Sequence, residues 1–189
     1  MAMEIKYGYK LFEMNSKGKL FPLFIDKGNE VPMGKWIHGK YVPTKGFSPR
    51  AGWHLGADVP DAPWLKGYTG TPTGAYKSRF RNGKRVWAEC AYNATIDYNQ
   101  DVALLKKKCF VDHLPENGFY FFREAGKGVW IITSDIQVTR ILTEGERREI
   151  MLRKGYDEVE AFADYNRRLA KRVKKGKKTI EDQYNDWLA

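Results

Sequence analysis

The stretch GFYFFREAGKGVWIITSDIQVTRIL, residues 118–142, decides the fold class. Two apolar and aromatic runs, 119–123 and 129–132, flank the turn-forming residues 125–128, and this pattern predicts a β-hairpin. Residues 136–142 then alternate apolar and polar side chains, which is typical of a strand with one buried face. The stretch therefore predicts a hairpin followed by a third strand.

A helical segment follows these strands. Thr143 and Glu146 have the spacing of a capping box, in which the threonine caps a helix and the glutamate reaches back to it. Gly155 is placed to end that helix. An apolar stripe from Val159 to Val173 predicts a second helix, and a third short helix is predicted to start at Thr179.

The N-terminal part of the chain predicts further strands. Residues 7–14 and 20–25 read as two strands joined by a turn at 15–18, with Pro22 indicating an edge strand or a bulge. Residues 31–37 predict one more short strand.

A second hairpin is predicted in the middle of the chain. The pair Asn82-Gly83 is a strong turn signal between the expected strands 76–81 and 85–92. Residues 101–114 suit a short helix in one part and a strand in another, and 115–118 form a turn.

Together these patterns predict an α+β fold with a twisted, mostly antiparallel sheet followed by C-terminal helices. Residues 1–142 are expected to form a mostly β basic domain. Residues 143–189 are expected to form a helical segment that packs on this domain or extends from it.

Composition excludes several classes of protein. The chain has 189 residues, of which 42% are hydrophobic and 14% aromatic, and this is typical of a globular domain rather than a disordered chain. Its apolar runs are too short to span a bilayer and its start lacks a signal peptide, so we expect a cytoplasmic protein with no membrane partner.

The residues that bear metal and redox chemistry are few. Cys90 and Cys109 form neither a disulfide framework nor a CxxC pair, and buried thiols in a reducing compartment are expected. Asp58 and Asp61 near His54 would need further ligands to hold a metal, so no metal site is predicted. Phosphate-binding P-loops and the common hydrolase motifs are absent from the sequence.

The net charge of +10 is unevenly distributed. Residues 31–88 hold ten Lys and Arg against two Asp and Glu, interleaved with aromatic residues, whereas residues 143–189 hold twelve against ten. Cations that meet phosphates and rings that stack on unpaired bases are the requirements of a nucleic-acid surface. The predicted nucleic-acid-binding residues lie around the second hairpin, where a solvated basic hairpin is the alternative: Lys77, Arg79, Arg81, Lys84 and Arg85.

The least regular segment, residues 43–56, is the predicted small-ligand site. Its prolines and glycines force a loop, and a strand is expected to start at Trp53 with Leu55 on the same face and His54 on the other. A histidine beside basic residues can bind phosphate, orient a hydroxyl or carry a proton, although it can also simply support the loop. The candidate ligand-binding residues are Thr44, Lys45, Arg50, Trp53 and His54.

The segments GYKLFE (8–13), PTKGFSPRAGWHLG (43–56) and residues 118–142 resemble a family of small proteins encoded by phages and prophages of gut bacteria. The resemblance spans most of residues 7–145 and implies an accessory protein of a mobile element, acting in the cytoplasm of a bacterial host in host takeover or counter-defence. The leading hypothesis is therefore a phage accessory protein that binds nucleic acid or a nucleotide-derived ligand, with no cofactor. A protein that inhibits a host or defence factor is one alternative, and the oligomeric state is left open.

Residues 52–54, Gly-Trp-His, also resemble an element of ADP-ribosyltransferase-like folds that lies beside the nicotinamide pocket. This resemblance implies an NAD-consuming enzyme as a second alternative, in which His54 orients NAD and Glu89 acts as the catalytic glutamate. The first strand departs from the pattern, because it carries Lys10 and Glu13 where that family has an arginine or histidine. Whether the chain is an enzyme is left open.

Overall fold

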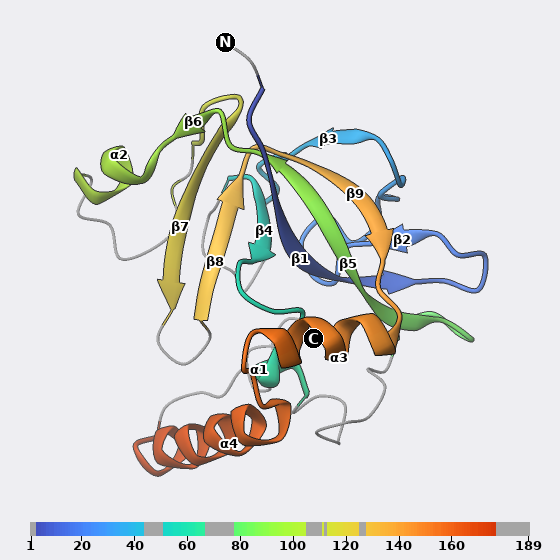
Figure 1. The fold of residues 1–189 in the computed structure, drawn as a ribbon, viewed down its shortest axis with the longest axis vertical. Helices are drawn as coiled ribbons and strands as arrows, with labels where there is room; N and C mark the ends of the chain where they lie inside the picture. The colour runs from blue at the N-terminus through green and yellow to red at the C-terminus, as the bar shows by residue number, and fades with distance from the viewer. Residues whose placement is uncertain are drawn as a thin grey trace.

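The computed structural model describes residues 3–43, 51–66, 78–104, 111, 113–124 and 128–176. These residues form a twisted, mostly antiparallel sheet with helices at its C-terminal end, which confirms the expected α+β class (Figure 1). The strand order is β3-β9-β5-β1-β4-β8-β7-β6, and β2 pairs with β1 outside this path. The strands are β1 (Ile5–Met14), β2 (Leu20–Phe21), β3 (Trp36–His38), β4 (Trp53–Gly56), β5 (Lys84–Asn93), β6 (Ile96–Asp97), β7 (Gly118–Glu124), β8 (Gly128–Thr133) and β9 (Asp135–Ile141). The helices are α1 (Pro63–Lys66), α2 (Asn99–Leu104), α3 (Glu144–Arg153) and α4 (Glu158–Lys174).

The hairpin of β1 and β2 is confirmed, but its second strand is shorter than predicted. The side chain of Asn15 accepts hydrogen bonds from the backbone of Lys17 and Lys19, which stabilises the turn. Strand β2 ends at Phe21, because Pro22 has no backbone N–H to continue the ladder. The expected strand at 31–37 is also shifted, since β3 begins at Trp36.

The predicted hairpin of residues 76–81 and 85–92 is wrong in its pairing. Residues 78–83 form turns, and β5 pairs along its whole length with β1 and, on its other edge, with β9. The turn itself lies where the sequence places it, with Asn82 at a φ of 58°. The partner of β5 thus comes from the N-terminus of the chain rather than from the preceding segment.

The strands predicted from residues 118–142 are confirmed. Strands β7 and β8 form a regular antiparallel hairpin, from the pair Phe119 and Thr133 to the pair Glu124 and Gly128. Strand β9 follows directly and crosses to the other side of the sheet, where it pairs with β5 and β3. A parallel pair of β6 with β7 completes the sheet edge, and α2 begins two residues after β6.

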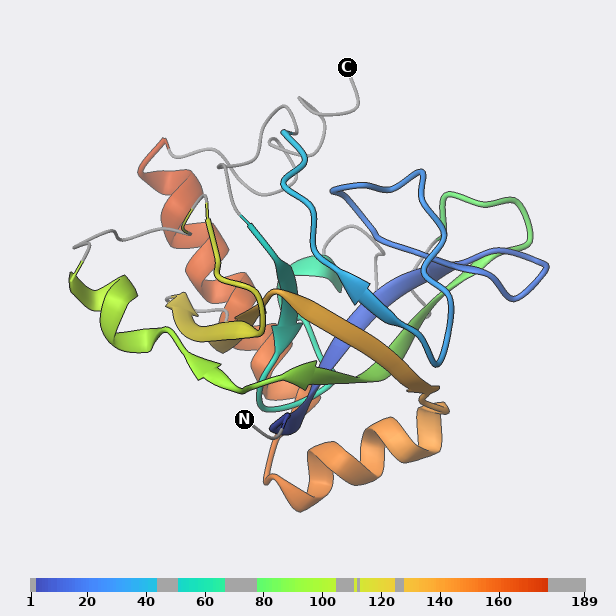
Figure 2. The same ribbon diagram turned by 90° about the horizontal axis from the view of Figure 1, so that it is seen from above.

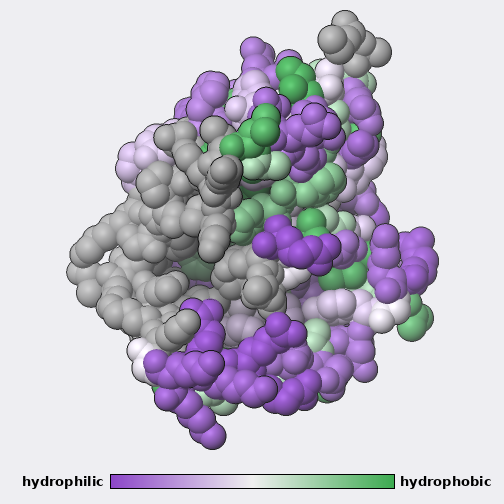
Figure 3. All heavy atoms as spheres, turned by 90° about the vertical axis from the view of Figure 1, so that its left-hand side faces the viewer, coloured by the Kyte–Doolittle hydropathy of each residue, from purple (hydrophilic) through white to green (hydrophobic). Residues whose placement is uncertain are grey.

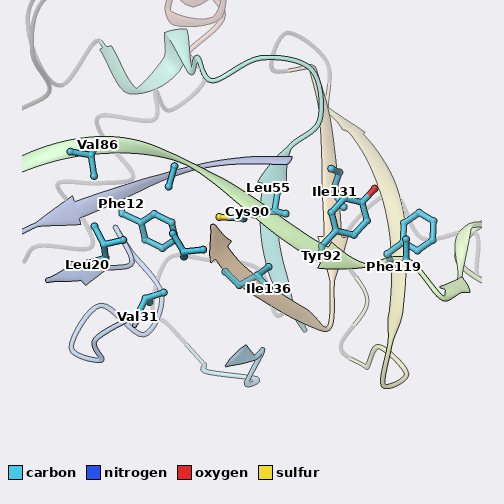
Figure 4. Close-up of a cluster of buried hydrophobic side chains, with 13 residues drawn as sticks. Phe12, Leu20, Val31, Leu55, Val86, Cys90, Tyr92, Phe119, Ile131 and Ile136 are labelled. Atoms are coloured by element: carbon cyan, nitrogen blue, oxygen red, sulfur yellow. The ribbon is translucent and has the colours of Figure 1, made fainter. Parts of the chain in front are cut away.

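The sheet curves around its main core (Figure 4). Side chains of β1, β4, β5 and β9 point into this interior, among them Phe12, Leu55, Cys90 and Ile136, each 0% exposed. Leu55 is fully buried here and Trp53 packs against the same cluster, so the predicted facing of β4 is confirmed.

A second cluster lies on the opposite face of β1 and β5. Leu11 and Trp87 pack there against Leu65 of α1 and Ile150 of α3. Helix α3 thus covers this face, and Figures 1 and 2 both show it lying along the sheet while α4 lies beyond α1.

Side chains cap the starts of α3 and α4. The predicted capping box is confirmed, with the Thr143 hydroxyl accepting from the Glu146 backbone and the Glu146 carboxylate accepting from the Thr143 backbone. Gly155 follows α3 with a φ of 63°, as predicted. In α4 the predicted apolar stripe is only partly covered, because Val159 and Val173 are 59% and 54% exposed. The helix predicted from Thr179 lies outside the described residues.

Candidate ligand-binding cleft

The candidate site lies where β1 and β4 separate. The two strands share a single registered pair, Tyr9 and Gly56, within the described residues. At this junction the backbones approach so closely that a Cβ on Gly8 would lie 3.1 Å from the Gly56 carbonyl oxygen. Beyond it the strands diverge, because β1 continues toward β2 whereas β4 remains paired with β8.

Lys10 bridges the two diverging strands. Its ammonium group donates a hydrogen bond to the backbone carbonyl of His54, at a distance of 2.9 Å between Nζ and O. The same group lies over the rings of Phe12 and Trp53, 5.8 and 5.6 Å from the ring centroids. The Lys10 side chain thus donates to the His54 carbonyl in place of a backbone N–H from regular pairing with β1.

This divergence opens into a cleft with a volume of about 960 Å³. It is lined by residues 22–26 and 29–31, by the end of β3 including His38, and by parts of β1 and β4. Residues 56–59 and 61–65, Trp130 of β8 and side chains of α4 complete the lining. In Figure 3 apolar patches appear in the middle of the face, and hydrophilic side chains gather at the bottom of the view, where Figure 1 places α4.

Aromatic side chains form a continuous row along the wall near β8. His54 meets Trp130 edge-on at a centroid distance of 6.2 Å, and Trp130 meets Trp64 of α1 at 5.4 Å. The buried indole Nε1 atoms of Trp130 and of Trp87, which also lines the cleft, have no acceptor within the described part of the chain. The row therefore offers flat apolar faces, and the unpaired indole N–H of Trp130 lies buried behind them.

The acidic groups around the cleft are mostly held by other protein groups. Asp61 accepts from the Tyr156 hydroxyl at 2.7 Å, Glu30 pairs with Lys19 at 2.6 Å, and Asp164 pairs with Arg168 at 2.6 Å. This pairing reduces the negative field in the cleft. The charged residues of the lining are Lys10, Asp26, Glu30, Lys40, Asp58, Asp61, Asp164 and Arg168.

Arg147 joins the helices to the wall of the cleft. It is 5% exposed and contacts carboxylates of Asp61, Glu144 and Glu158 at 3.6, 2.9 and 2.8 Å. Burial by itself lowers the pKa of Arg147, but the hydrogen bonds with Glu144 and Glu158 outweigh this and raise it. The guanidinium therefore remains charged and links α3 and α4 to the segment that carries Asp61.

His38 at the cleft wall is oriented by an acid. Its Nδ1 lies 3.0 Å from a carboxylate oxygen of Asp135, the residue opposite it in the pairing of β3 and β9. Asp135 also accepts a hydrogen bond from the Ser134 hydroxyl. This arrangement fixes the plane of the imidazole at the edge of the cleft.

Only part of the predicted small-ligand site can be placed. Trp53 and His54 both line the cleft. Thr44, Lys45 and Arg50 lie outside the described residues. Glu89, the predicted catalytic glutamate, lies away from the lining and forms an ion pair with Arg140 at 3.1 Å, near the start of α3. Within the described structure His54 and Glu89 do not meet in one site.

The predicted nucleic-acid-binding residues have different surroundings. Arg85 is buried, with its side chain 8% exposed, and pairs with Glu13 at 2.8 Å, so its charge is not presented on the surface. Arg79, Arg81 and Lys84 are exposed, although Arg79 is also bound to the carbonyls of Leu23 and Lys27. Lys77 lies outside the described residues.

Sequence reasoning missed three cleft residues: Lys10, Trp64 and Trp130. Each lies in a segment that is ordinary by itself, and only the fold brings them together. A lysine between Gly8 and Phe12, on the face of β1 that turns toward the core, was the one signal that the sequence contained.

No family model matches the chain, and no curated protein or solved structure was found to be similar to it. In the part of the chain that the structure describes, no group of three or more His, Cys, Asp or Glu side chains is placed to hold a metal ion. None of the described helices is long and apolar enough to cross a membrane.

Proposed function

We propose that the cleft binds a ligand that carries a nucleobase, either as a nucleotide derivative or as an unpaired base of a nucleic acid. The observation that carries this proposal is the row of His54, Trp130 and Trp64 along one wall of a cleft of about 960 Å³. Stacking of a base on an aromatic side chain contributes about 1–3 kcal/mol to binding, whichever base it is. The cleft is also large enough for a whole nucleotide, since small-ligand pockets typically measure about 300–1,000 Å³.

The donors in the wall match the chemistry of a base edge. Nucleobases present carbonyl oxygens and ring nitrogens, which are acceptors. Trp87 and Trp130 line the cleft, and their indole N–H groups are buried behind it without an acceptor among the described residues, so a small turn of either ring would offer a donor to a base. A buried donor gains from such a partner because leaving it unsatisfied costs about 1–3 kcal/mol.

The charge of the cleft is compatible with a phosphate at one end. Lys10 and Lys40 line the side near β3, where Glu30 is paired with Lys19 and Asp26 accepts a hydrogen bond from Asn29. Asp61 and Asp164 on the other side are likewise bound to protein groups. We therefore place the base on the tryptophan side and the phosphate on the lysine side. With the resemblance to phage-encoded proteins, this supports an accessory protein that acts on nucleic acid or nucleotides of its host.

Calorimetric titration with the four nucleoside monophosphates, the matching nucleosides and NAD tests this proposal. Trp64→Ala is expected to weaken nucleotide binding by roughly 5- to 150-fold, which corresponds to one lost stacking contact. Lys10→Met is expected to weaken binding of the monophosphates but not of the nucleosides.

Trp36→Ala is the matched control, because Trp36 is a partly exposed tryptophan of β3 that does not line the cleft. Unfolding curves of each variant establish that the fold is retained. Absence of heat with every nucleotide, or equal losses in the Trp64 and Trp36 variants, would contradict the proposal.

A further inference from the structure

A second surface, which we call the basic corner, lies next to the cleft. It comprises Lys17, Lys27, Arg79, Arg81 and Lys84, from three segments that the fold brings together. The register of β1 and β5 ends with Met14 opposite Lys84, so the turn at 15–18 and the turn at 78–83 lie side by side (Figures 1 and 2).

Three of the five cations of the basic corner have no acidic partner among the described residues. Lys17, Arg81 and Lys84 form no ion pair within the described part of the chain. The nearby acids have other partners, because Glu13 is buried against Arg85 and Glu30 binds Lys19. Lys17, Arg81 and Lys84 therefore present their charges toward solvent.

Arg79 connects the basic corner to the cleft. Its guanidinium lies over the rings of Phe80 and Phe21, 4.8 and 6.0 Å from the centroids. It also donates to the carbonyls of Leu23 and Lys27, at the two ends of a turn whose residues line the cleft. The turn from Leu23 to Lys27 thus contacts Arg79 of the basic corner and also contributes residues to the cleft.

We propose that the basic corner binds the phosphate backbone of a single-stranded nucleic acid, of which one base enters the cleft. This inference rests on the proposed function and specifies its ligand as a strand rather than a free nucleotide. A single strand is required because a base that is paired in a duplex cannot reach the tryptophan row. Cations around a cleft that stacks bases are the usual arrangement in single-strand binders.

The C-terminal half of α4 and the residue after it form a second basic surface, where Lys171 and Lys175 are exposed and form no ion pair within the described residues. Arg167 and Arg168 there pair with Glu160 and Asp164, each at 2.6 Å, within their own helix. Charge reversal in these two places therefore separates a specific strand site from general attraction of a cationic protein for polyanions.

The test is fluorescence anisotropy with labelled single-stranded DNA and RNA of about 12 nucleotides, within the usual site size of such binders, and with a matching duplex. Titrations are made at about 50 and 200 mM salt, where phosphate contacts give a steep dependence of affinity on salt. The variant Arg81→Glu/Lys84→Glu is compared with Lys171→Glu/Lys175→Glu, two exposed lysines near the end of α4.

We expect single strands to bind more tightly than the duplex. The corner variant should lower the salt slope of log K by about 1.4, because each lost phosphate contact on a single strand contributes about 0.7. The α4 variant should change it little, and calorimetric binding of monophosphates should be the same in both variants and the wild type.

Two results would overturn the inference: equal losses in the two variants, or oligonucleotide binding no tighter than that of a monophosphate. If the corner variant alone loses strand binding while monophosphates do not bind at all, the base-binding cleft is wrong and the phosphate contact stands without it. The two hypotheses are thereby tested separately.

Discussion

Strand β1 is hydrogen-bonded in different ways along its two edges. On one edge β1 pairs with β5 over ten consecutive residues, from Ile5 opposite Asn93 to Met14 opposite Lys84. On the other edge it pairs with β4 only at Tyr9 and Gly56, and Lys10 then takes over a carbonyl of β4 with its side chain. The first edge belongs to the packed core, whereas the second opens into the cleft.

The comparison shows that a cleft can be created by leaving a ladder unfinished. Backbone groups in a sheet must be hydrogen-bonded. Where a lysine provides one of these bonds, the neighbouring strands are free to separate without leaving buried carbonyls unsatisfied. The edge of β1 that pairs with β5, which we call the closed edge, has no such freedom. Its charged pair of Glu13 and Arg85 is buried there. Three variants test this difference.

The largest effect is expected on the closed edge. Glu13 is 1% exposed and accepts hydrogen bonds from Arg85, Ser78 and the backbone of Arg79. Glu13→Ala leaves the arginine charge buried without its partner, so we expect a loss of about 3–5 kcal/mol in the free energy of unfolding. Urea denaturation measures this loss.

Glu4→Ala is the matched control just before the start of the same strand, because the ion pair of Glu4 and Lys6 is exposed and is expected to contribute at most about 1 kcal/mol. If Glu13→Ala does not fold, Glu13→Gln keeps the side-chain size and gives the comparison. Similar costs for the buried and the exposed pair would show that the closed edge is not sealed as described.

An intermediate effect is expected at the junction of the two edges. A methyl group on Gly8 would lie 2.9 Å from Cδ1 of Ile131 and 3.1 Å from the carbonyl oxygen of Gly56. Gly8→Ala should therefore cost about 1–3 kcal/mol and push β4 away from β1. Denaturation measures the cost, and faster amide exchange at the Tyr9 and Gly56 pair would locate it.

Gly28→Ala is the control, because no atom would lie within 4 Å of the added carbon and its φ is not positive. A Gly8 variant as stable as the Gly28 variant would mean that the strands at the junction can separate at little cost.

The smallest of the three effects is a pH dependence of stability, which involves the Cys90 thiol on β5. Burial raises the pKa of the Cys90 thiol to about 12, from 9.0 for an accessible thiol. The folded state thus keeps this proton more tightly than the unfolded state. Its contribution to stability is complete below pH 9.0 and is lost as the pH rises toward about 12, by at most about 1.4 kcal/mol per pH unit.

Unfolding of the wild type and of Cys90→Ala between pH 7 and roughly 10.5 checks this dependence, since Cys109 is common to both proteins. The difference in free energy between them should shrink above pH 9.0. A difference that stays constant across this range would argue that the thiol is accessible in the folded protein.

The sequence predicted those parts of the fold that depend on local pattern. Alternation at 136–142 and the capping box of Thr143 and Glu146 are local signals, and both are confirmed. The hairpin predicted around Asn82 was wrong because a turn signal specifies where the chain bends but not which strand its neighbour joins. Strand β5 gains more by pairing its ten residues with β1 than a short hairpin offers.

For the candidate site, the sequence predicted only the residues that lie within a single segment of the chain. Trp53 and His54 adjoin each other, and the facing of β4 followed from alternation alone. Lys10, Trp64 and Trp130 are separated by more than fifty residues from one another, so no spacing rule connects them. The burial of Arg85 was equally hidden, because its partner Glu13 is 72 residues away.

The contact between Trp64 and Trp130 has an optical consequence. Two indole rings whose centroids are 5.4 Å apart at an angle of 54° couple their electronic transitions, and this coupling gives a paired positive and negative band in the ultraviolet circular dichroism spectrum. A base that inserts between the rings, or turns one of them, changes the sign or size of that pair of bands. Under the proposed function, this pair of chromophores would report a base in the cleft without any added label.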